Sequence, residues 1–235
     1  MKYMGSKARI AKHILPIILK DRNHGQWYVE PFVGGANVID KVDCPRIASD
    51  QNTYLIQMWK ALLHGWMPVE ITKETYTHIK NNKDKHLGFA VGWAGFNCSY
   101  SGKYFGGFAG KVNTKIGTVR NYQEESIKNV LKQIVNLSGV YFHCLKYDEL
   151  PIPENSIIYC DPPYKGTTKY NVDFDHDVFF NWCRKMKSLG HSVFISEYSA
   201  PDDFREVWSK EVKSSLSANG KHGSSKSSVE KLFTI

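Results

Sequence analysis

Trp27-Tyr28-Val29-Glu30-Pro31-Phe32-Val33-Gly34-Gly35 joins an apolar run to a pair of glycines. The run at 27–33 predicts a strand, and the glycines predict a tight turn into a helix at about 36–41. Residues 46–50, Arg-Ile-Ala-Ser-Asp, repeat the pattern as a second strand, and a helix is predicted over about 52–63. This strand-helix-strand-helix order is typical of a parallel sheet covered by helices.

The same alternation continues on both sides of this stretch. Upstream, isoleucines recur at helical spacing behind a capping Ser6, which predicts a helix over 6–20. Downstream we predict strands at 139–145, 156–160 and 191–196, a helix at about 176–188 capped by Asp175, and two antiparallel strands at 204–214 and 229–235. The predicted fold class is therefore α/β, with a seven-stranded mixed sheet.

The alternation breaks between residues 61 and 135. This region contains three predicted helices, at about 72–82, 86–94 and 123–137, around the glycine- and aromatic-rich segment 92–108. We predict that 92–108 forms a surface hairpin or loop. Residues 61–135 are thus interpreted as an insertion into a domain made of residues 1–60 and 136–235.

The tetrapeptide Asp161-Pro162-Pro163-Tyr164 directly follows the apolar strand 156–160. The lone pair of an exocyclic amino group on a nucleobase is delocalised into the ring. The Asp161 carboxylate and the Pro162 carbonyl could accept hydrogen bonds from its two N–H groups, and Tyr164 could stack on the ring. A base reaches such a pocket only after it leaves the double helix. The alternative is a stiff turn after a strand.

The turn at Glu30–Gly35 predicts a second binding site. Glycines there let the backbone approach a ligand, and Asp50, twenty residues after Glu30, has the position of an acid that binds ribose hydroxyls. The pattern G-x-G-x-x-G is missing, and Glu30 would repel phosphates. A ligand with a ribose and a zwitterionic tail, such as S-adenosylmethionine, fits better. The alternative is again a tight strand–helix turn.

Charge is unevenly distributed along the chain. The net charge is +8, and residues 55–140 hold eleven Lys and Arg against five Asp and Glu. Residues 28–54 and 141–204, which contain the strand-like segments of the site, are net acidic. This distribution favours an acidic catalytic centre within a surface that attracts a polyanion, although an ordinary solvated surface would also explain it.

Other features exclude several classes of protein. No segment approaches the roughly 20 apolar residues of a membrane span, and residues 1–7 lack the apolar middle of a signal peptide. The five cysteines form no C-x-x-C pair, and we expect Cys144, Cys160 and Cys183 to be buried thiols of a cytoplasmic protein. No metal is expected, since the acids and histidine at 173–177 match no known ligand spacing.

Together these residues resemble the DNA adenine-N6 methyltransferase (Dam-like, D12 class) family over most of the chain. Tyr3-Met4-Gly5-Ser6-Lys7, the turn at 30–35, Asp161-Pro162-Pro163-Tyr164 and Ser196-Glu197-Tyr198 look like its motifs, in the same order. The second glycine directly follows the first here, where the family pattern has a spacer. The resemblance implies a Rossmann-like S-adenosylmethionine-dependent methyltransferase fold and a cofactor site made of Tyr3, Lys7, Glu30, Pro31, Phe32, Gly34, Gly35, Asp50, Asp148 and Asp161.

The resemblance also implies partners for the chain. Asp161, Pro162 and Tyr164 are the catalytic candidates, and the insertion would bind double-stranded DNA through residues such as Lys103, Lys111, Lys115 and Arg120. We expect a monomer, with a dimer as the alternative. The chain is compatible with a solitary, a restriction-linked or a phage-encoded enzyme.

We therefore predict a site-specific, S-adenosylmethionine-dependent DNA (adenine-N6)-methyltransferase. The first alternative is the same chemistry on cytosine N4, RNA adenine or a glutamine side chain. The second is a nucleic-acid-binding protein without catalysis, and the third is a nicotinamide oxidoreductase, which Glu30 and the missing glycine pattern disfavour.

Overall fold

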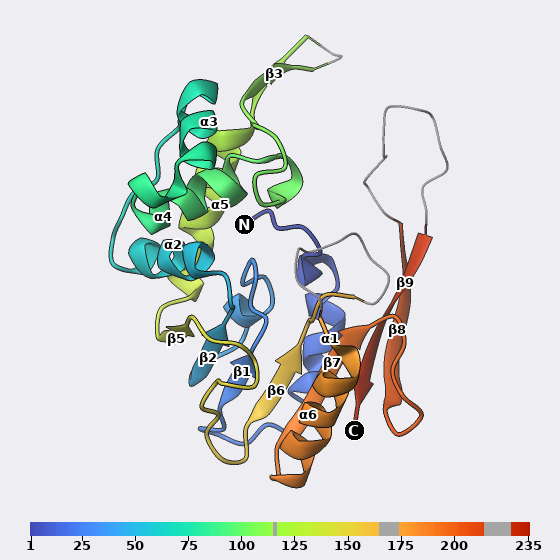
Figure 1. Ribbon diagram of the computed structural model, residues 1–235. Helices are drawn as coiled ribbons and strands as arrows, with labels where there is room; N and C mark the ends of the chain where they lie inside the picture. The colour runs from blue at the N-terminus through green and yellow to red at the C-terminus, as the bar shows by residue number, and fades with distance from the viewer. Residues whose placement is uncertain (115–116, 165–173, 214–226) are drawn as a thin grey trace. The chain divides into compact units, whose positions relative to one another are not determined.

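A computed structural model describes residues 1–114, 117–164, 174–213 and 227–235 of the chain (Figure 1). Within these residues, seven strands belong to one mixed sheet in the order β5-β2-β1-β6-β7-β9-β8. Their bounds are β1 Tyr28–Glu30, β2 Arg46–Ser49, β5 Val140–His143, β6 Ile157–Cys160, β7 Ser192–Glu197, β8 Arg205–Lys213 and β9 Ser227–Thr234. The predicted seven-stranded mixed α/β fold is confirmed.

The chain divides into two compact units. The first unit contains residues 1–12 and 31–151, and the second contains residues 13–30 and 152–235. These boundaries differ from the predicted ones, because they describe compactness rather than function. The assignment of 61–135 to DNA recognition stays a prediction.

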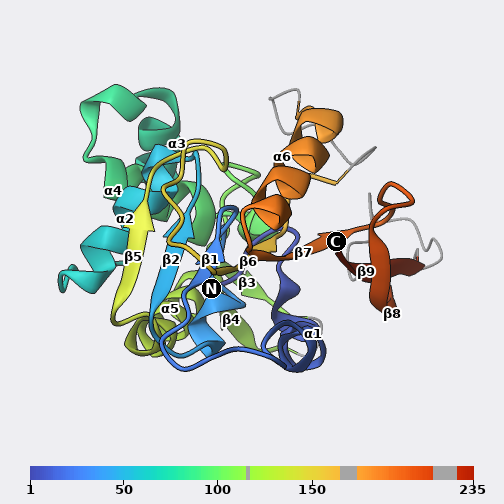
Figure 2. The ribbon, with the colours of Figure 1, turned by 90° about the horizontal axis from the view of Figure 1, so that it is seen from below.

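In the first unit, β2 and β5 pair in parallel, with Ile47 opposite Tyr141. Helix α2 (Thr53–Leu63) lies beside β5, where Trp59 stacks on Phe142 with ring centroids 6.1 Å apart (Figure 2). Asn52 caps α2 by accepting a hydrogen bond from the Leu55 N–H. The apolar face of α2 thus covers the parallel strand pair, as the 3.6-residue periodicity predicts.

The insertion contains the expected helices but a different hairpin. Its helices are α3 (Lys73–Asn81), α4 (Gly88–Gly92) and α5 (Tyr122–Asn136), with 3₁₀ turns η3 (Lys83–Lys85) and η5 (Tyr100–Gly102). Residues Trp93–Asn97 form a buried π-helical turn, η4, so the prediction of a surface hairpin or loop over 92–108 is wrong for these residues. The rest of the segment is a loop closed by an antiparallel bridge between Ser99 and Phe108. The side chains of Trp93, Phe96 and Phe105 are buried inside the unit instead.

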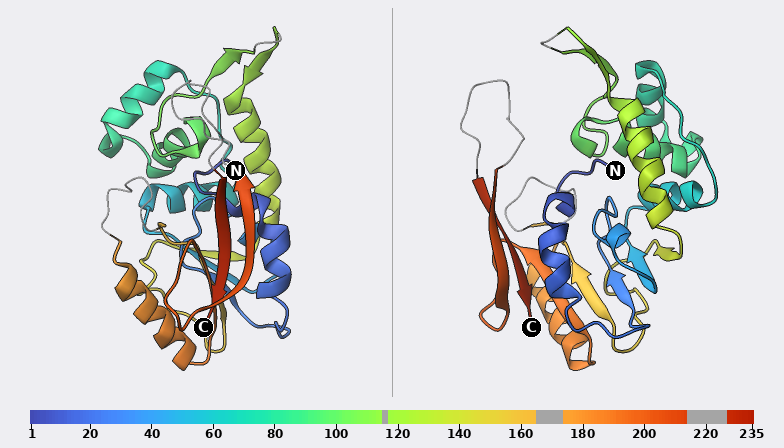
Figure 3. Two further views of the ribbon diagram at one scale, coloured as in Figure 1. Left: turned by 90° about the vertical axis from the view of Figure 1, so that its right-hand side faces the viewer. Right: turned by 180° about the vertical axis from the view of Figure 1, so that it is seen from behind.

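The hairpin lies further along the chain. Strands β3 (Lys111–Asn113) and β4 (Val119–Asn121) pair antiparallel directly before α5 (Figure 3). Their side chains are exposed or half-buried, and basic residues stand on both strands. Alternation was hard to detect here because three-residue strands give almost no periodicity.

In the second unit, β1, β6 and β7 run parallel, and the pairs β7–β9 and β8–β9 are antiparallel. All four residues of β6 are buried, which explains its continuous apolar run. Helix α6 (His176–Ser188) lies beside β7 (Figure 3), and the predicted cap is confirmed because Asp175 accepts from the N–H groups of Asp177 and Val178. The two predicted final strands are also confirmed.

The N-terminal helix is shorter than predicted. Ser6 caps a 3₁₀ turn, η1 (Lys7–Arg9), by accepting from the Ala8 N–H, and the α-helix α1 spans only Ala11–Ile18. The helix expected at 36–41 is a single 3₁₀ turn, η2 (Ile39–Lys41). Both segments are helical as predicted, but α1 is shorter than expected and the segment at 36–41 has no α-helix.

The cysteines and the search for membrane-spanning helices bear on two further predictions from the sequence. Cys160 and Cys183 are buried, but Cys144 is exposed, because it lies one residue beyond the end of β5. Within the described ranges, no helix combines the length and apolarity that crossing a bilayer requires.

Candidate active site

The second unit places three site residues at one edge of its strands. Glu30 ends β1, Asp161 follows β6 and Glu197 ends β7. Because these strands are parallel, their carboxyl ends share one edge of the sheet. That edge is where open α/β sheets bind ligands.

Tyr164 is held on two sides at this edge. Its hydroxyl donates a hydrogen bond to Glu230 Oε2 on β9 at 3.0 Å, and its ring meets the Tyr198 ring edge-on with centroids 4.6 Å apart. Burial raises the pKa of Tyr164 well above its ordinary value, and the nearby carboxylates of Asp161 and Glu230 raise it further. The phenol therefore stays protonated, and its ring is fixed from the hydroxyl end.

Glu30 is a buried acid with a defined partner. Its side chain is 3% exposed, and Oε1 accepts a hydrogen bond from the Tyr28 hydroxyl at 2.9 Å. Burial raises the pKa of Tyr28, and the neighbouring Glu30 charge adds to the effect. Tyr28 is therefore a donor at any physiological pH. A buried carboxylate of this kind is suited to a cationic ligand group.

The Asp161–Tyr164 loop contacts a histidine that the sequence analysis did not single out as functional. The carbonyl oxygen of Pro163 lies 3.0 Å from His176 Nε2, and the same nitrogen lies 3.6 Å from Glu197 Oε2. In the sequence, His176 belongs to the group of acids and histidine at 173–177 for which no metal is expected. Its position at the start of α6, directly after a capping aspartate, was the one available signal.

The first unit contains the glycine turn. Gly34 has φ +47° and donates its N–H to Asp50 Oδ2 at 3.1 Å, while Asp50 Oδ1 accepts from the Asn52 N–H at 2.9 Å. Trp59 Nε1 donates to the Gly34 carbonyl at 3.1 Å. Burial raises the pKa of Asp50, and the two backbone N–H groups partly offset that rise. Asp50 therefore ties the turn to the end of β2.

Tyr3 lies directly against this turn. A Cβ atom added at Gly34 would lie 2.6 Å from Tyr3 Cε1, and one at Gly35 would lie 2.6 Å from Tyr3 Cβ. The Tyr3 ring also stacks on Phe96, with centroids 5.6 Å apart. The structure thus brings Tyr3, Gly34, Gly35 and Asp50 together, and both glycines are required by close approach.

The other predicted cofactor residues of the first unit lie as follows. Lys7 is only 7% exposed and donates from Nζ to the Gly5 carbonyl at 3.1 Å. Phe32 stacks on Tyr147 with centroids 5.4 Å apart, and the next residue, Asp148, is exposed in the turn after β5. Phe32 and the Asp148 turn are therefore close neighbours.

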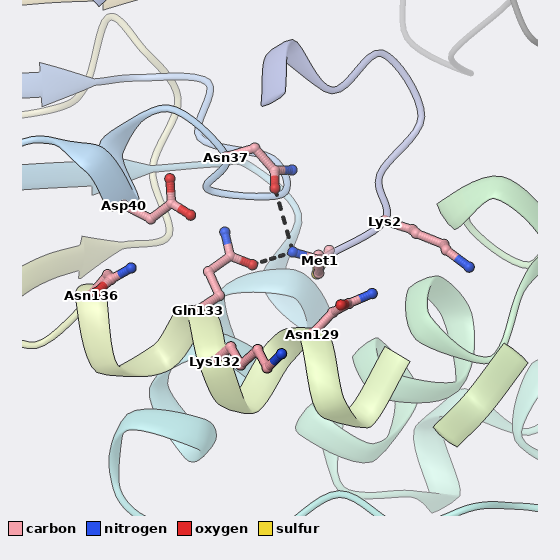
Figure 4. A pocket seen from close by; sticks show the side chains of 8 residues that line it. All are labelled: Met1, Lys2, Asn37, Asp40, Asn129, Lys132, Gln133 and Asn136. Atoms are coloured by element: carbon pink, nitrogen blue, oxygen red, sulfur yellow. Dashed lines mark hydrogen bonds between the residues drawn. The ribbon is translucent and has the colours of Figure 1, made fainter. Parts of the chain in front are cut away.

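A pocket of about 350 Å³ in the first unit is lined by Met1, Lys2, Asn37, Asp40 and four residues of α5 (Figure 4). Gln133 of α5, which lines it, donates from Nε2 to the carbonyls of Gly35 and Ala36 at 3.0 and 2.9 Å. Gln133 also accepts from the Met1 amino group, whose pKa burial lowers to about 6. None of the predicted cofactor residues lines this pocket, and the two backbone hydrogen bonds of Gln133 brace the turn beside it.

The predicted DNA contacts of the insertion are exposed where they are described. Lys103 and Lys111 are exposed, and Lys115 lies outside the described residues. Arg120 on β4 makes a two-point ion pair with Glu125, at 2.6 and 2.9 Å, and its guanidinium lies 4.6 Å from the centre of the Tyr122 ring. Arg120 is thus held in a defined orientation on the hairpin.

A family model decides which class of protein carries this arrangement. The model of the D12 class N6 adenine-specific DNA methyltransferases matches residues 3–91 and 92–221. The chain belongs to this family. The prediction of the D12 class family is confirmed, and the description of that family gives N6 adenine-specific DNA methyltransferase as the enzyme class.

Individual relatives of this D12 class chain are distant. The modification methylase StsI of Streptococcus sanguinis is 26% identical over 84% of this chain, which spans 33% of that protein's length. The type II methyltransferase M.MjaIII of Methanocaldococcus jannaschii is 25% identical over 88% of this chain and 86% of its own length. A solved structure of SMU.472, described as a methyltransferase and complexed with SAH, covers 98% of this chain and 53% of its own, at 12% identity and a TM-score of 0.36.

Proposed function

We propose that this protein transfers the methyl group of S-adenosylmethionine to the N6 amino group of an adenine that has left a DNA double helix. The observation that carries the proposal is the Asp161–Tyr164 loop at the carboxyl end of β6, with the Tyr164 ring fixed by Glu230 and Tyr198. An aromatic ring with a carboxylate and a proline carbonyl beside it suits a flat, amine-bearing base.

Each group of the loop has a proposed role. The Asp161 carboxylate and the Pro162 carbonyl accept hydrogen bonds from the two N6 hydrogens, so that the nitrogen lone pair localises. Tyr164 stacks on the base. Bound beside the loop, the cofactor would supply its methyl group to the oriented nitrogen, and the proton that N6 loses would pass to water. Alignment and electrostatics are the protein's contribution.

The residues of the glycine turn fit the cofactor. Each Asp50 oxygen accepts one backbone N–H, and a carboxylate oxygen can accept a second hydrogen bond, so Asp50 can still bind ribose hydroxyls. We propose that Glu30 pairs with the cofactor's ammonium group, that Phe32 and Asp148 contact its adenine, and that Tyr3, Lys7, Pro31, Gly34 and Gly35 shape the turn. When bound, S-adenosylmethionine supplies an already activated methyl group.

The experiment that tests this function follows labelled methyl transfer to DNA, RNA and peptide pools. Nucleoside analysis of the product should show N6-methyladenine from double-stranded DNA. N4-methylcytosine or a labelled RNA or peptide would contradict the substrate assignment. Asp161→Ala should abolish turnover while DNA is still bound, and Asp202→Ala, which removes an exposed carboxylate of the same unit, should keep full activity.

We also propose that the β3–β4 hairpin contacts DNA through Lys111 and Arg120. Arg120 could release Glu125 and bind a DNA phosphate instead, and its guanidinium would then keep the same two-point geometry. Arg120→Ala should weaken DNA binding and lower the slope of log Kd against log salt by about one. Arg184 is the matched control, since it makes the same two-point ion pair with Asp203, at 2.7 and 2.8 Å, in the second unit. Equal effects of Arg184→Ala and Arg120→Ala would refute the hairpin assignment.

A further inference from the structure

His176 makes a directed hydrogen bond to the backbone of the catalytic loop. The distance from its Nε2 to the Pro163 carbonyl oxygen is 3.0 Å. A carbonyl oxygen can only accept, so Nε2 carries the hydrogen and donates it. His176 is the first residue of α6, and Asp175 fixes that end of the helix by accepting from two backbone N–H groups. The donor thus stands on a capped helix end.

The orientation of the His176 ring is fixed from several sides. Its side chain is 15% exposed, and its Nε2 also lies 3.6 Å from Glu197 Oε2. Glu197 is itself only 1% exposed, and its Oε1 accepts from the Tyr198 N–H at 2.7 Å. The Phe174 ring meets the imidazole edge-on at 5.0 Å. Rotation of the imidazole would therefore break the hydrogen bond to Pro163 and the contacts with Glu197 and Phe174.

The loop needs an external anchor for a chemical reason. Residues 161–164 belong to no helix or strand, and Pro162 and Pro163 have no N–H to donate. Tyr164 is tied through its side chain to Glu230, whereas Pro163 is tied through its backbone to His176. Because a peptide group is planar, fixing the Pro163 carbonyl also fixes the direction in which the chain enters Tyr164.

We infer that His176 is a positioning residue for methyl transfer. Together with Glu197, it fixes the position of the backbone between the Pro162 carbonyl and the Tyr164 ring. The inference rests on the proposed function, since it assigns a role within the same site. His176 does not touch the base or the cofactor in this scheme. A misplacement of about 1 Å at reacting groups can cost about 100-fold in rate, so loss of the anchor should appear in kcat.

The test compares His176→Leu, His176→Gln and His176→Asn in the full-length protein. Leucine removes the donor, glutamine carries an N–H at about the reach of Nε2, and asparagine is one methylene shorter. We expect kcat on DNA to fall about 10- to 100-fold in the leucine and asparagine variants and by less than about threefold in the glutamine variant. KM for S-adenosylmethionine and its binding in calorimetry should change by less than about twofold, because His176 contacts no cofactor group.

A second buried histidine provides the matched control. His191 lies at the opposite edge of the same strands, 6% exposed, where its Nδ1 accepts from the Ser156 N–H at 3.1 Å. His191→Leu should lower the unfolding temperature but leave kcat of the folded protein unchanged. Hydrogen exchange of a peptide that contains Tyr164 should accelerate in His176→Leu and not in His191→Leu.

The outcomes separate this inference from the proposed function. Wild-type protein that methylates no DNA would refute the function itself. Active wild-type protein with equal kcat in His176→Leu, or with equal loss in the glutamine and asparagine variants, would refute the positioning role alone. If the leucine variant does not fold, the glutamine and asparagine pair decides the question, since both retain a polar side chain.

Discussion

Replacing Gly34 by alanine should destabilise the protein through a single neighbouring ring. Gly34 has φ +47°, and an added Cβ would lie 2.6 Å from Tyr3 Cε1 and 3.0 Å from Cζ. The left-handed backbone costs an L-residue about 1–2 kcal/mol. Forcing an extra carbon against a packed ring typically costs about 1–3 kcal/mol more. Gly34→Ala should therefore lower the free energy of unfolding by about 2–5 kcal/mol.

A double-mutant cycle isolates the steric part of that cost. In a Tyr3→Ala background the ring is gone, so Gly34→Ala should cost only the backbone part, about 1–2 kcal/mol. The cycle should give a coupling of about 1–3 kcal/mol, well above the roughly 0.3–0.5 kcal/mol of independent sites. Gly35→Ala should show no such rescue, because its added Cβ meets Tyr3 Cβ at 2.6 Å and Asn37 Nδ2 at 2.5 Å, and alanine at position 3 keeps that Cβ.

The assay is guanidinium unfolding of the wild type, the single variants and the two double variants, followed by far-UV circular dichroism. A chain of this length shifts its melting temperature by about 2–4 °C per kcal/mol, so thermal unfolding gives an independent reading. Additive costs for Gly34→Ala and Tyr3→Ala would refute the reasoning. Equal rescue of both glycine variants would also refute it, since the two atoms closest to an added Cβ at Gly35, Asn37 Nδ2 and Tyr3 Cβ, remain when position 3 is alanine.

Three further predictions concern other contacts. Tyr164→Phe keeps the ring but removes its hydrogen bond to Glu230, so kcat should fall less than in Tyr164→Ala; equal losses would mean that stacking is not the function of the ring. The hydrogen bond from Arg120 is the main cause that lowers the pKa of Glu125 from 4.5 to about 2. At this exposed pair the interaction should stabilise the fold by at most about 1 kcal/mol. That stabilisation, measured against Glu125→Gln, should be present above pH 4.5 and disappear as the pH falls towards 2. A difference that persists at pH 2 would contradict the assignment. Asp175→Ala should cost about 0.5–2 kcal/mol in thermal unfolding because it removes a helix cap, and an unchanged melting temperature would contradict that role.

Local signals in the sequence predicted most of the secondary structure. The apolar run at 157–160 indicated a buried central strand, and the caps at Ser6 and Asp175 followed from side chains that reach the next turn of backbone. The glycine pair at 34–35 indicated close approach, which the structure confirms. These features depend on residues a few positions apart, so the sequence carries them directly.

The prediction from sequence was wrong where the packing environment of a segment outweighs its composition. Residues 92–108 have the glycine and aromatic content of a surface loop, yet Trp93–Asn97 form a buried helical turn. Aromatic side chains gain more from packing together than from lying in water, and that gain depends on neighbours elsewhere in the chain. The true hairpin, at 111–121, has strands too short to show alternation.

By itself, the sequence determined the fold class and the motif order, and it predicted the chemistry of the loop at 161–164. The tertiary structure alone showed which distant side chains hold the site: Tyr3 against the glycine turn, Glu230 on the Tyr164 hydroxyl and His176 on the Pro163 carbonyl. The physical reason is that secondary structure depends on local spacing, whereas a hydrogen bond or a close contact depends on where separate elements pack.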